Sequence, residues 1–337
     1  MVGNVNSFAL LTSVLALLWS LPAAAQSSQR VVIAAVGDVA PGEPQEGLLQ
    51  KDWQSVLGVT AEPLRQADVA FANLEAPLPP ADAKPWPRGS LPLLVGKPEL
   101  AATLAKAGFD VVSLANNHVF DYHRVGVDGT LAAVERAGLA HTGLGVSAKD
   151  AEKPAILLRN GVRIGFIAAT DRVNRSADAG ADRAVVAWLN PAQLQARIRE
   201  LRPHVDIVVV SLHWGLSYHL GVLESQRRIA AQLVEAGADL ILGSHPHVLE
   251  PVEQISGVPV AFSLGNFLFG GQQGDRGRTL VLQAEFSVTP GRTRPQLVAV
   301  RCLPAVVNAQ RQLVAPSSAE DLAAFAEFRR HASGCAQ

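Results

Sequence analysis

The chain has 337 residues, of which 48% are hydrophobic and 18% are charged, and its 29 Lys and Arg nearly balance its 30 Asp and Glu. This composition supplies ample apolar material for a core and excludes a disordered chain or a repeat fibre. A formal net charge of −1 gives no whole-chain attraction for a polyanion, and we find no local patch that would replace it. We therefore expect one large globular domain with an appendage, and no nucleic-acid partner.

The first 25 residues resemble a secretory signal peptide. Residues 8–21 form an apolar run, and residues 22–25 supply small side chains for cleavage. The run is too short for a comfortable membrane span. The basic segment typical of a signal peptide is missing, because no Lys or Arg precedes Arg30, which leaves an uncleaved membrane anchor as the alternative. We expect an exported protein, periplasmic or extracellular, whose mature chain begins near Gln26.

Both cysteines, Cys302 and Cys335, lie in the C-terminal part of the chain. In an exported protein they could pair and fix the tail, whereas two unpaired thiols are the alternative, because spacing does not determine pairing. Neither cysteine belongs to a clustered motif, so neither is a candidate nucleophile or zinc ligand.

Short runs rich in Val and Ile predict buried strands, and segments of helical period separate several of them. Three of the predicted helices end at a glycine in the expected stop position, Gly108, Gly138 or Gly237. This alternation predicts an α/β fold whose strands are buried on both faces. The predicted strands are 31–36, 68–72, 110–114, 163–169, 206–212 and 239–242, and the predicted helices are 53–66, 98–107, 125–137, 191–201 and 223–236.

Other segments refine this architecture. The dipeptides Asn160-Gly161 and Ser256-Gly257 predict hairpins, so we expect a mixed sheet or two packed sheets. Residues 76–98 contain seven prolines and predict a long loop near the functional site. Residues 291–337, with a helical pattern at 319–330, predict a C-terminal extension.

Metal-binding and amide side chains follow one predicted strand after another. Alone, each is more often a turn residue or a hydrogen-bonded histidine. In α/β sheets, however, the carboxyl ends of the strands converge where ligands bind, so we expect these groups to meet. They are Asp38; Asn73 and Glu75; Asn116, Asn117, His118 and Asp121; His213; His245 and His247; and Asn266.

This set suits a two-metal site. Carboxylates and imidazoles bind divalent zinc, manganese or iron, and one bridging carboxylate can hold two ions about 3.5–4 Å apart. Such ions lower the pKa of a bound water and neutralise phosphoryl oxygens during in-line attack. His118 could then protonate the leaving oxygen, and Asp121 could orient its imidazole.

The ordered motifs resemble those of the capsule synthesis protein CapA family of poly-gamma-glutamate biosynthesis, whose fold is similar to that of calcineurin-like metallophosphoesterases. The resemblance spans roughly residues 30–270 and implies a layered α/β/β/α sandwich of mixed sheets over residues 28–290. The matching motifs are GD at 37–38, NLE at 73–75, SLANNHVFDY at 113–122, HWG at 213–215, GSHPH at 243–247 and SLGNF at 263–267.

The resemblance also implies roles for single residues. It implies a cofactor of one or two divalent ions, of which manganese, zinc, iron and magnesium are equally open, and a catalytic His118 assisted by Asp121. Asn73, Asn116 and Asn266 would support the loops around the site. The implied metal ligands are Asp38 and His247 for the first ion, Glu75 as the bridge, and Asn117, His213 and His245 for the second ion.

Two departures from the phosphoesterase pattern affect the first ion. Ala40 occupies the place of a histidine, and Glu75 replaces the usual bridging aspartate. The first ion would therefore be weakly held or absent, which leaves a single-metal enzyme or a fold that binds without turnover as alternatives. A serine hydrolase is a weaker reading, because the chain has no Gly-x-Ser-x-Gly motif.

The function implied by the resemblance is synthesis, attachment or export of an anionic polymer such as poly-gamma-glutamate. The expected partners are this polymer or a phosphoester substrate, together with membrane-bound capsule synthase subunits. Arg88 and Arg172 are candidate contacts for an anionic substrate, as are Lys84, Lys97 and Arg175. Trp214 is a candidate for stacking, although packing is the default role of a tryptophan.

Overall fold

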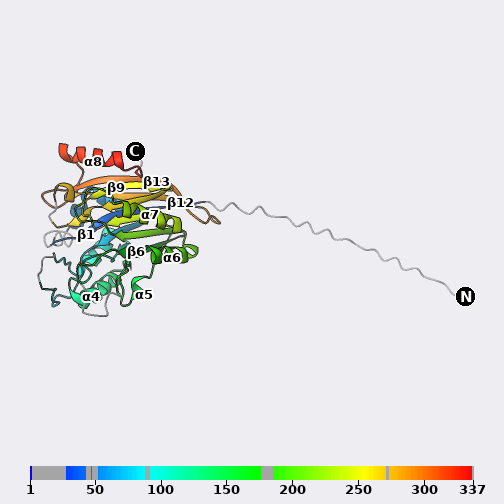
Figure 1. Cartoon of the computed structure of the whole chain (residues 1–337), viewed down its shortest axis with the longest axis horizontal. Coiled ribbons are helices and arrows are strands. Elements are labelled where there is room, and N and C mark those ends of the chain that lie inside the picture. Colours follow the sequence, from blue (N-terminus) through cyan, green and yellow to red (C-terminus); the bar gives the residue numbers. More distant parts are fainter. Residues whose placement is uncertain are drawn as a thin grey trace.

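A computed structural model describes residues 28–42, 52–87, 92–175, 185–270 and 273–335, together with residues 1 and 47 (Figure 1). The predicted signal peptide, apart from Met1, and the predicted substrate contact Arg88 lie outside the described residues, so both stay predictions. Within the described residues, the model contains no helix with the length and apolar character needed to cross a membrane.

The first of two mixed sheets is built around the N-terminal strand. β1 (Gln29–Ala40) pairs in parallel with β2 (Val69–Leu74) and antiparallel with β12 (Arg278–Val288). The order is β14-β13-β12-β1-β2-β3-β4, and β11 pairs with the end of β1. The remaining strands are β3 (Val111–Ser113), β4 (Ala140–Thr142), β11 (Asn266–Phe269), β13 (Gln296–Val307) and β14 (Leu313–Val314).

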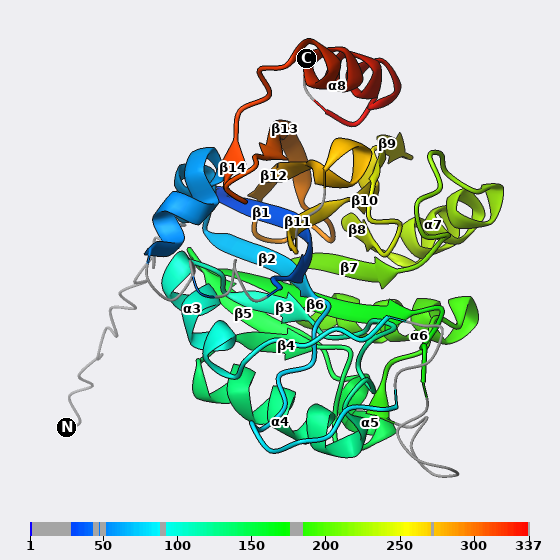
Figure 2. The same cartoon turned by 90° about the vertical axis from the view of Figure 1, so that its left-hand side faces the viewer.

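Part of the predicted C-terminal extension belongs to this sheet. β13 pairs with β12 and β14 pairs with β13, so the expected boundary after residue 290 falls between two paired strands. The chain then forms α8 (Ala319–His331), close to the predicted helix, and Figures 1 and 2 place it beyond the sheets next to β9 and β13. Cys302 on β13 forms a disulfide with Cys335 after α8, so pairing is the one observed of the two alternatives that the sequence left open.

The second sheet has the order β5-β6-β7-β8-β10-β9. Both predicted hairpins are confirmed, because β5 pairs antiparallel with β6 and β9 pairs antiparallel with β10. Asn160 and Ser256, which open these turns, adopt φ angles of 52° and 51°. The strands are β5 (Ala155–Arg159), β6 (Val162–Thr170), β7 (Ile207–His213), β8 (Leu240–Ser244), β9 (Leu249–Ile255) and β10 (Val258–Leu264).

Four of the five predicted helices form as expected. They are α3 (Glu99–Ala107), α4 (His123–Arg136), α6 (Pro191–Leu201) and α7 (Glu224–Ala236), and the short α5 (Ala148–Ala151) was not predicted. The prediction of one helix over 53–66 is wrong. Residues 52–57 are helical, but the segment turns at η1 (Gly58–Thr60) before α2 (Ala61–Arg65). Gly58 has a φ of 47°, and a Cβ there would lie 2.0 Å from the Leu313 carbonyl oxygen, so the chain bends around β14.

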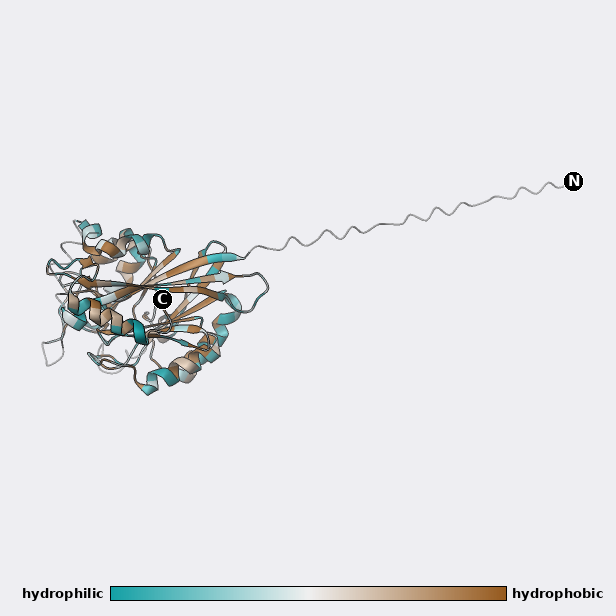
Figure 3. Cartoon of the chain, turned by 90° about the horizontal axis from the view of Figure 1, so that it is seen from above, coloured by the Kyte–Doolittle hydropathy of each residue, from teal (hydrophilic) through white to brown (hydrophobic). Residues whose placement is uncertain are grey.

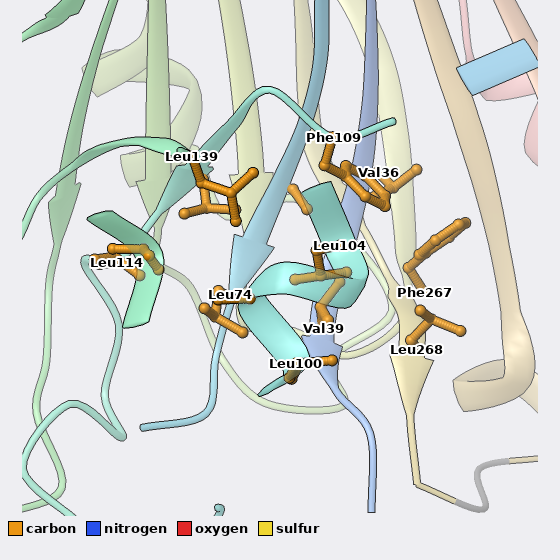
Figure 4. Packing of buried hydrophobic residues seen from close by; sticks show 14 of the residues in the cluster. Val36, Val39, Leu74, Leu100, Leu104, Phe109, Leu114, Leu139, Phe267 and Leu268 are labelled. Atoms are coloured by element: carbon orange, nitrogen blue, oxygen red, sulfur yellow. The ribbon is translucent and has the colours of Figure 1, made fainter. Parts of the chain in front are cut away.

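The alternation of side chains along the strands builds three apolar layers. Val31, Ile33 and Ala35 of β1 pack between the two sheets against Phe166 and Val209 of the second sheet. The alternate residues of β1 face the helices on the outer side of the first sheet, and Figure 4 shows Val36 near Phe109 and Val39 near Leu100 and Leu104 of α3.

The outer face of the second sheet buries side chains of α6 and α7, including Ile198 and Leu233. Figure 3 shows the result, with apolar strands inside and hydrophilic helix surfaces outside. The described residues therefore form the α/β/β/α sandwich that was predicted.

Candidate metal centre

The candidate site lies where strands of both sheets end. Asp38 of β1 is in register with Asn73 of β2 on one side and Asn266 of β11 on the other. The Asp38 amide donates to the Gly265 carbonyl oxygen at 2.9 Å. A Cβ on Gly37 would lie 1.9 Å from that oxygen, so only glycine allows the two segments to approach this closely.

Glu75 lies at the middle of the site, directly after β2. Its side chain is completely buried, and within the described residues neither carboxylate oxygen has a hydrogen-bond partner. The Nε2 atoms of His213 and His247 each lie 3.6 Å from Glu75 Oε1, and His118 Nε2 lies 4.0 Å from it. A buried carboxylate without hydrogen bonds is costly unless a cation compensates it.

Three histidines come from the second sheet. His213 ends β7, and His245 and His247 follow β8 with left-handed φ angles of 96° and 60°. Such angles are strained for residues with a Cβ and are concentrated at functional sites. The His245 amide donates to Asp38 Oδ2 at 3.2 Å, which joins the loop after β8 to the first sheet.

The predicted assignment divides the ligands into two groups that share Glu75. In the first group, Asp38 Oδ2 lies 3.3 Å from His247 Nδ1. In the second, His213 Nε2 lies 2.8 Å from Asn117 Oδ1 and 3.1 Å from His245 Nδ1. Ligand atoms of Glu75, His245 and His247 lie within 4.8 Å of one another, as do those of Asp38, Glu75 and His213. The fold thus brings all six predicted ligands together.

Burial and mutual charge shift the pKa values of this cluster strongly. Burial raises the pKa of Glu75 well above its usual range and lowers that of His213 well below it. Burial, Arg172 and His247 lower the pKa of His245 to about 3. Burial also disfavours the charged ring of His247, but Glu75 and Asp38 outweigh it and raise the pKa of His247 to about 10. Without a metal, His247 and the buried carboxylates therefore compete for a proton.

The residues present fit a divalent cation. Oxygen and imidazole donors suit zinc, manganese and iron, and the free oxygens of Glu75 match a bridging ligand. Ala40, at the place of the missing histidine, is in register with Phe269 of β11, whose ring lies 4.8 Å from the ring of His247. The first group therefore has an apolar wall where a further ligand would stand, which leaves it with fewer donors than the second.

The three predicted supporting residues make hydrogen bonds around the ligands. Asn73 Nδ2 donates to Asp38 Oδ1 at 2.8 Å, and Asn116 Nδ2 donates to the Leu74 carbonyl oxygen at 2.8 Å. Asn266 Oδ1 lies 2.9 Å from His247 Nδ1. These contacts orient ligands and the loops that carry them, as outer partners of metal ligands do.

His118 and Asp121 form a close pair beside the ligands. His118 Nδ1 lies 2.6 Å from Asp121 Oδ2, and the opposite ring nitrogen faces Glu75. Two residues that were not predicted for this role contact the pair from the loop after β6. Asn174 Nδ2 lies 3.3 Å from His118 Nε2, and Arg175 Nη1 donates to Asp121 Oδ1 at 3.0 Å. Their position after a predicted strand was the available signal.

The predicted substrate contacts have different outcomes. Arg172 lies near the histidines but forms an ion pair with Asp171, 2.6 Å from Nε to Oδ1. The prediction that Trp214 stacks on substrate is wrong, because its side chain is 1% exposed, packs parallel to Phe262 and donates from Nε1 to the Phe262 carbonyl oxygen.

A further cation near the site was not predicted. Arg276 lies 5.2 Å from the ring centroid of Tyr218, and that exposed ring is 5.7 Å from the ring of His247. No sequence pattern predicts the contact between Tyr218 and Arg276, because the two residues come from separate loops that follow different strands.

Comparisons with known proteins place the chain among capsule synthesis proteins. The PGA biosynthesis protein CapA of Bacillus subtilis is 34% identical over 236 residues, which cover 69% of this chain and 62% of that protein. The capsule biosynthesis protein CapA of Bacillus anthracis is 30% identical over 254 residues, covering 74% of this chain and 62% of that protein. The chain thus matches less than two thirds of the length of these relatives.

A solved structure extends the fold comparison. A novel phosphatase from Mycoplasma pneumoniae aligns with a TM-score of 0.51 at 12% identity, over 86% of this chain and 96% of that one. This likeness concerns the fold alone. The model of the bacterial capsule synthesis protein family PGA_cap matches residues 32–271, which include every predicted metal ligand, and the chain therefore belongs to that family.

Proposed function

We propose that this chain is an exported, metal-dependent hydrolase of the phosphoesterase type that acts in the synthesis, attachment or export of an anionic capsule polymer such as poly-gamma-glutamate. The family membership supports the capsule role. The observation that carries the hydrolase proposal is Glu75, a buried carboxylate that accepts no hydrogen bond from the described residues and whose Oε1 faces the Nε2 atoms of three histidines.

The metal would be held by the six clustered ligands and would supply an activated water and charge neutralisation for a phosphoryl group. The chain's own residues would do the rest. Asn73, Asn116 and Asn266 fix ligands and loops, and Asp121 fixes the His118 ring with Nε2 directed towards the ligand cluster. A proton held on Nε2 would pass to the leaving oxygen.

The charge around the site suits an anionic substrate. Arg172 and Arg276 lie near the ligand cluster, and Arg276 rests on an exposed tyrosine ring instead of in a buried ion pair. We infer that they attract the polymer or ester towards the site. Membrane-bound capsule synthase subunits remain the proposed partners.

Export is supported by two features. The N-terminal apolar run is typical of a signal peptide, and the Cys302–Cys335 disulfide would persist in an oxidising compartment. We therefore propose a periplasmic or extracellular location, with a membrane-anchored form if the N-terminal segment is not cleaved. Fractionation of cells that express the full chain, followed by N-terminal sequencing, tests the location and the cleavage together. We expect a processed chain that begins near Gln26. An unprocessed chain in the cytoplasm would contradict export.

Metal content and turnover test the hydrolase proposal. We expect protein purified without chelator to contain metal and to hydrolyse an activated phosphomonoester or phosphodiester. His245→Ala should lose metal and activity together, because it removes one of four donors from the second group. His118→Ala should keep the metal and lose activity by about 100-fold or more, the usual contribution of a general acid. Full activity in His118→Ala would refute its assignment as the acid.

A non-catalytic polymer-binding subunit is the second candidate, favoured by the apolar wall of Ala40 and Phe269 in the first group. It predicts metal-dependent binding of poly-gamma-glutamate without turnover of any ester. Hydrolysis that follows metal content across the variants would exclude it.

A further inference from the structure

The loop after β6 ties the two sheets together beside the candidate site. We define residues 171–175 as the crossing segment. At its start, the Asp171 amide donates to the His213 carbonyl oxygen at 3.1 Å, on the second sheet. Near its end, the Asn174 amide donates to the Asn117 carbonyl oxygen at 2.8 Å, on the loop after β3 of the first sheet. The segment thus donates to the backbone carbonyl oxygens of two proposed metal ligands.

The side chains of the crossing segment act on the His118–Asp121 pair. Asn117 Nδ2 donates to Asn174 Oδ1 at 3.3 Å, which directs Asn174 Nδ2 towards His118 Nε2, also at 3.3 Å. Arg175 Nη1 donates to Asp121 Oδ1 at 3.0 Å and to the Pro92 carbonyl oxygen at 3.1 Å. The Arg175 side chain is only 10% exposed, so this contact lies in a largely water-excluded place.

Asp121 is therefore held at both oxygens. Oδ1 accepts from Arg175, and Oδ2 accepts from the Leu94 amide at 2.7 Å and faces His118 Nδ1 at 2.6 Å. A carboxylate fixed in this way cannot rotate, so the His118 ring has one orientation, with Nε2 towards the ligand cluster. An acid of fixed orientation matters most when the leaving oxygen is strongly basic, because an aliphatic alkoxide leaves poorly without a proton, whereas a nitrophenolate leaves readily.

We propose that Arg175 is a positioning residue that holds the His118–Asp121 pair for protonation of a strongly basic leaving group. This inference rests on the proposed function. In the reaction, a water oxygen forms a bond to phosphorus, and the ester P–O bond breaks with its electron pair on the alcohol oxygen. That oxygen takes the Nε2 proton, the water releases a proton to solvent, and His118 regains one from solvent, which gives an alcohol and a phosphate.

Asn174, also in the crossing segment, contacts the ring of His118. Its Nδ2 is an amide donor that faces His118 Nε2 at 3.3 Å, so this contact must break before Nε2 can carry the proton that the leaving oxygen takes. Its orientation by Asn117 couples this donor to the loop that carries a proposed metal ligand.

The test compares Arg175→Met with wild type on phosphate esters whose leaving groups range from 4-nitrophenol to an aliphatic alcohol. We expect kcat for the alkyl ester to fall about 10- to 100-fold more than kcat for the nitrophenyl ester, because the lost assistance is that of a general acid. Arg175→Lys keeps the charge but not the forked donor. Its dependence of kcat on the leaving group should therefore lie between those of wild type and Arg175→Met. Equal losses on all esters would overturn the positioning role.

A matched control is available in the second sheet. Arg202 forms a largely buried ion pair with Asp239, away from the ligand cluster. Arg202→Met should destabilise the protein in a similar way but should leave the dependence on the leaving group unchanged. If kcat changed its dependence on the leaving group equally in both variants, general loosening of the fold would be the cause. That result would refute a specific effect of Arg175.

A proton NMR measurement separates failure of this inference from failure of the proposed function. The close His118–Asp121 contact predicts a strongly downfield Nδ1 proton in wild type and in Arg202→Met, which is lost or shifted upfield in Arg175→Met. If wild type turns over no ester, the proposed hydrolase function fails, but this resonance still tests the positioning role. An unchanged resonance in Arg175→Met would overturn it whatever the activity.

Discussion

The candidate metal centre and the junction of α8 with the sheets treat buried charge in opposite ways. At the centre, the carboxylate of Glu75 is completely buried, and within the described part of the chain its oxygens accept no hydrogen bond. At the junction, the guanidinium of Arg278 is 8% exposed but forms ion pairs with three carboxylates, those of Asp275, Glu320 and Asp321.

This difference in how buried charge is compensated separates a region that we assign to function from a region that we assign to stability. The junction also carries the Cys302–Cys335 disulfide, so both of its features hold α8 in place. The centre instead combines the carboxylate of Glu75, which accepts no hydrogen bond from the described residues, with the strained backbone of His245 and His247, a cost in folding free energy that a bound cation would offset. Substitutions at the centre should therefore abolish metal-linked properties, whereas substitutions at the junction should change stability alone.

The largest effect is expected for Glu75→Gln. Removing the proposed bridging carboxylate should lower metal-dependent activity by about 100-fold or more and should abolish the rise in Tm on addition of metal. Activity assays and thermal unfolding with added Mn²⁺ or Zn²⁺, before and after chelation, measure both. Retention of the metal-dependent rise in Tm would contradict the bridging role.

Glu250→Gln provides a matched control for this change. Glu250 on β9 is also a buried glutamate whose oxygens lack hydrogen-bond partners among the described residues, but its oxygens belong to neither ligand group. The control variant should keep both metal and activity. Loss of metal in Glu250→Gln would show that neutralising any buried carboxylate disturbs the centre.

The next largest effect concerns the junction. Replacing both cysteines by serine should lower the free energy of unfolding by about 2–4 kcal/mol, because the disulfide closes a loop between residues 33 positions apart. Urea unfolding of the double variant, and of wild type with and without reductant, measures this loss. Reductant should destabilise wild type and leave the variant unchanged, while metal content stays the same in both. A fall in metal content on loss of the disulfide would break the proposed separation.

The residue pattern predicted an α/β fold with a mixed sheet or two packed sheets because each strand carries its own signal, whereas the α/β/β/α layering was implied by the family resemblance. Val31, Ile33 and Ala35 alternate along β1 with residues that face the helices, and a strand buried on both faces appears as an apolar run. The helix predicted over 53–66 failed because its bend depends on β14, a segment far away in the sequence. Local periodicity cannot indicate such a tertiary contact.

The ligand cluster was predictable for a similar reason, because Asp38, Glu75 and His213 lie near or directly after the ends of strands, and strand ends converge. Two kinds of residue could not be predicted from the sequence in this way. Trp214 follows a ligand but turns into the core, and the direction of a side chain after a strand depends on the local backbone. Asn174 and Arg175 act only through residues of the other sheet, so their roles appear only when the two sheets are seen packed together.

The smallest effect is expected for Glu250→Gln as a function of pH. Burial raises the pKa of Glu250 from 4.5 to about 8, although Gln226 and Arg227 lower it in part. Because the folded state binds this proton more tightly than the unfolded chain, wild type should lose stability as pH rises from about 4.5 to about 8. The neutral glutamine does not undergo this loss, so the variant should gain about 1–3 kcal/mol relative to wild type between about pH 5 and about pH 9. Urea unfolding of both proteins at these two pH values measures the difference in the free energy of unfolding, with chelator present to exclude metal effects. Equal pH dependence in the two proteins would mean that Glu250 is solvated in solution.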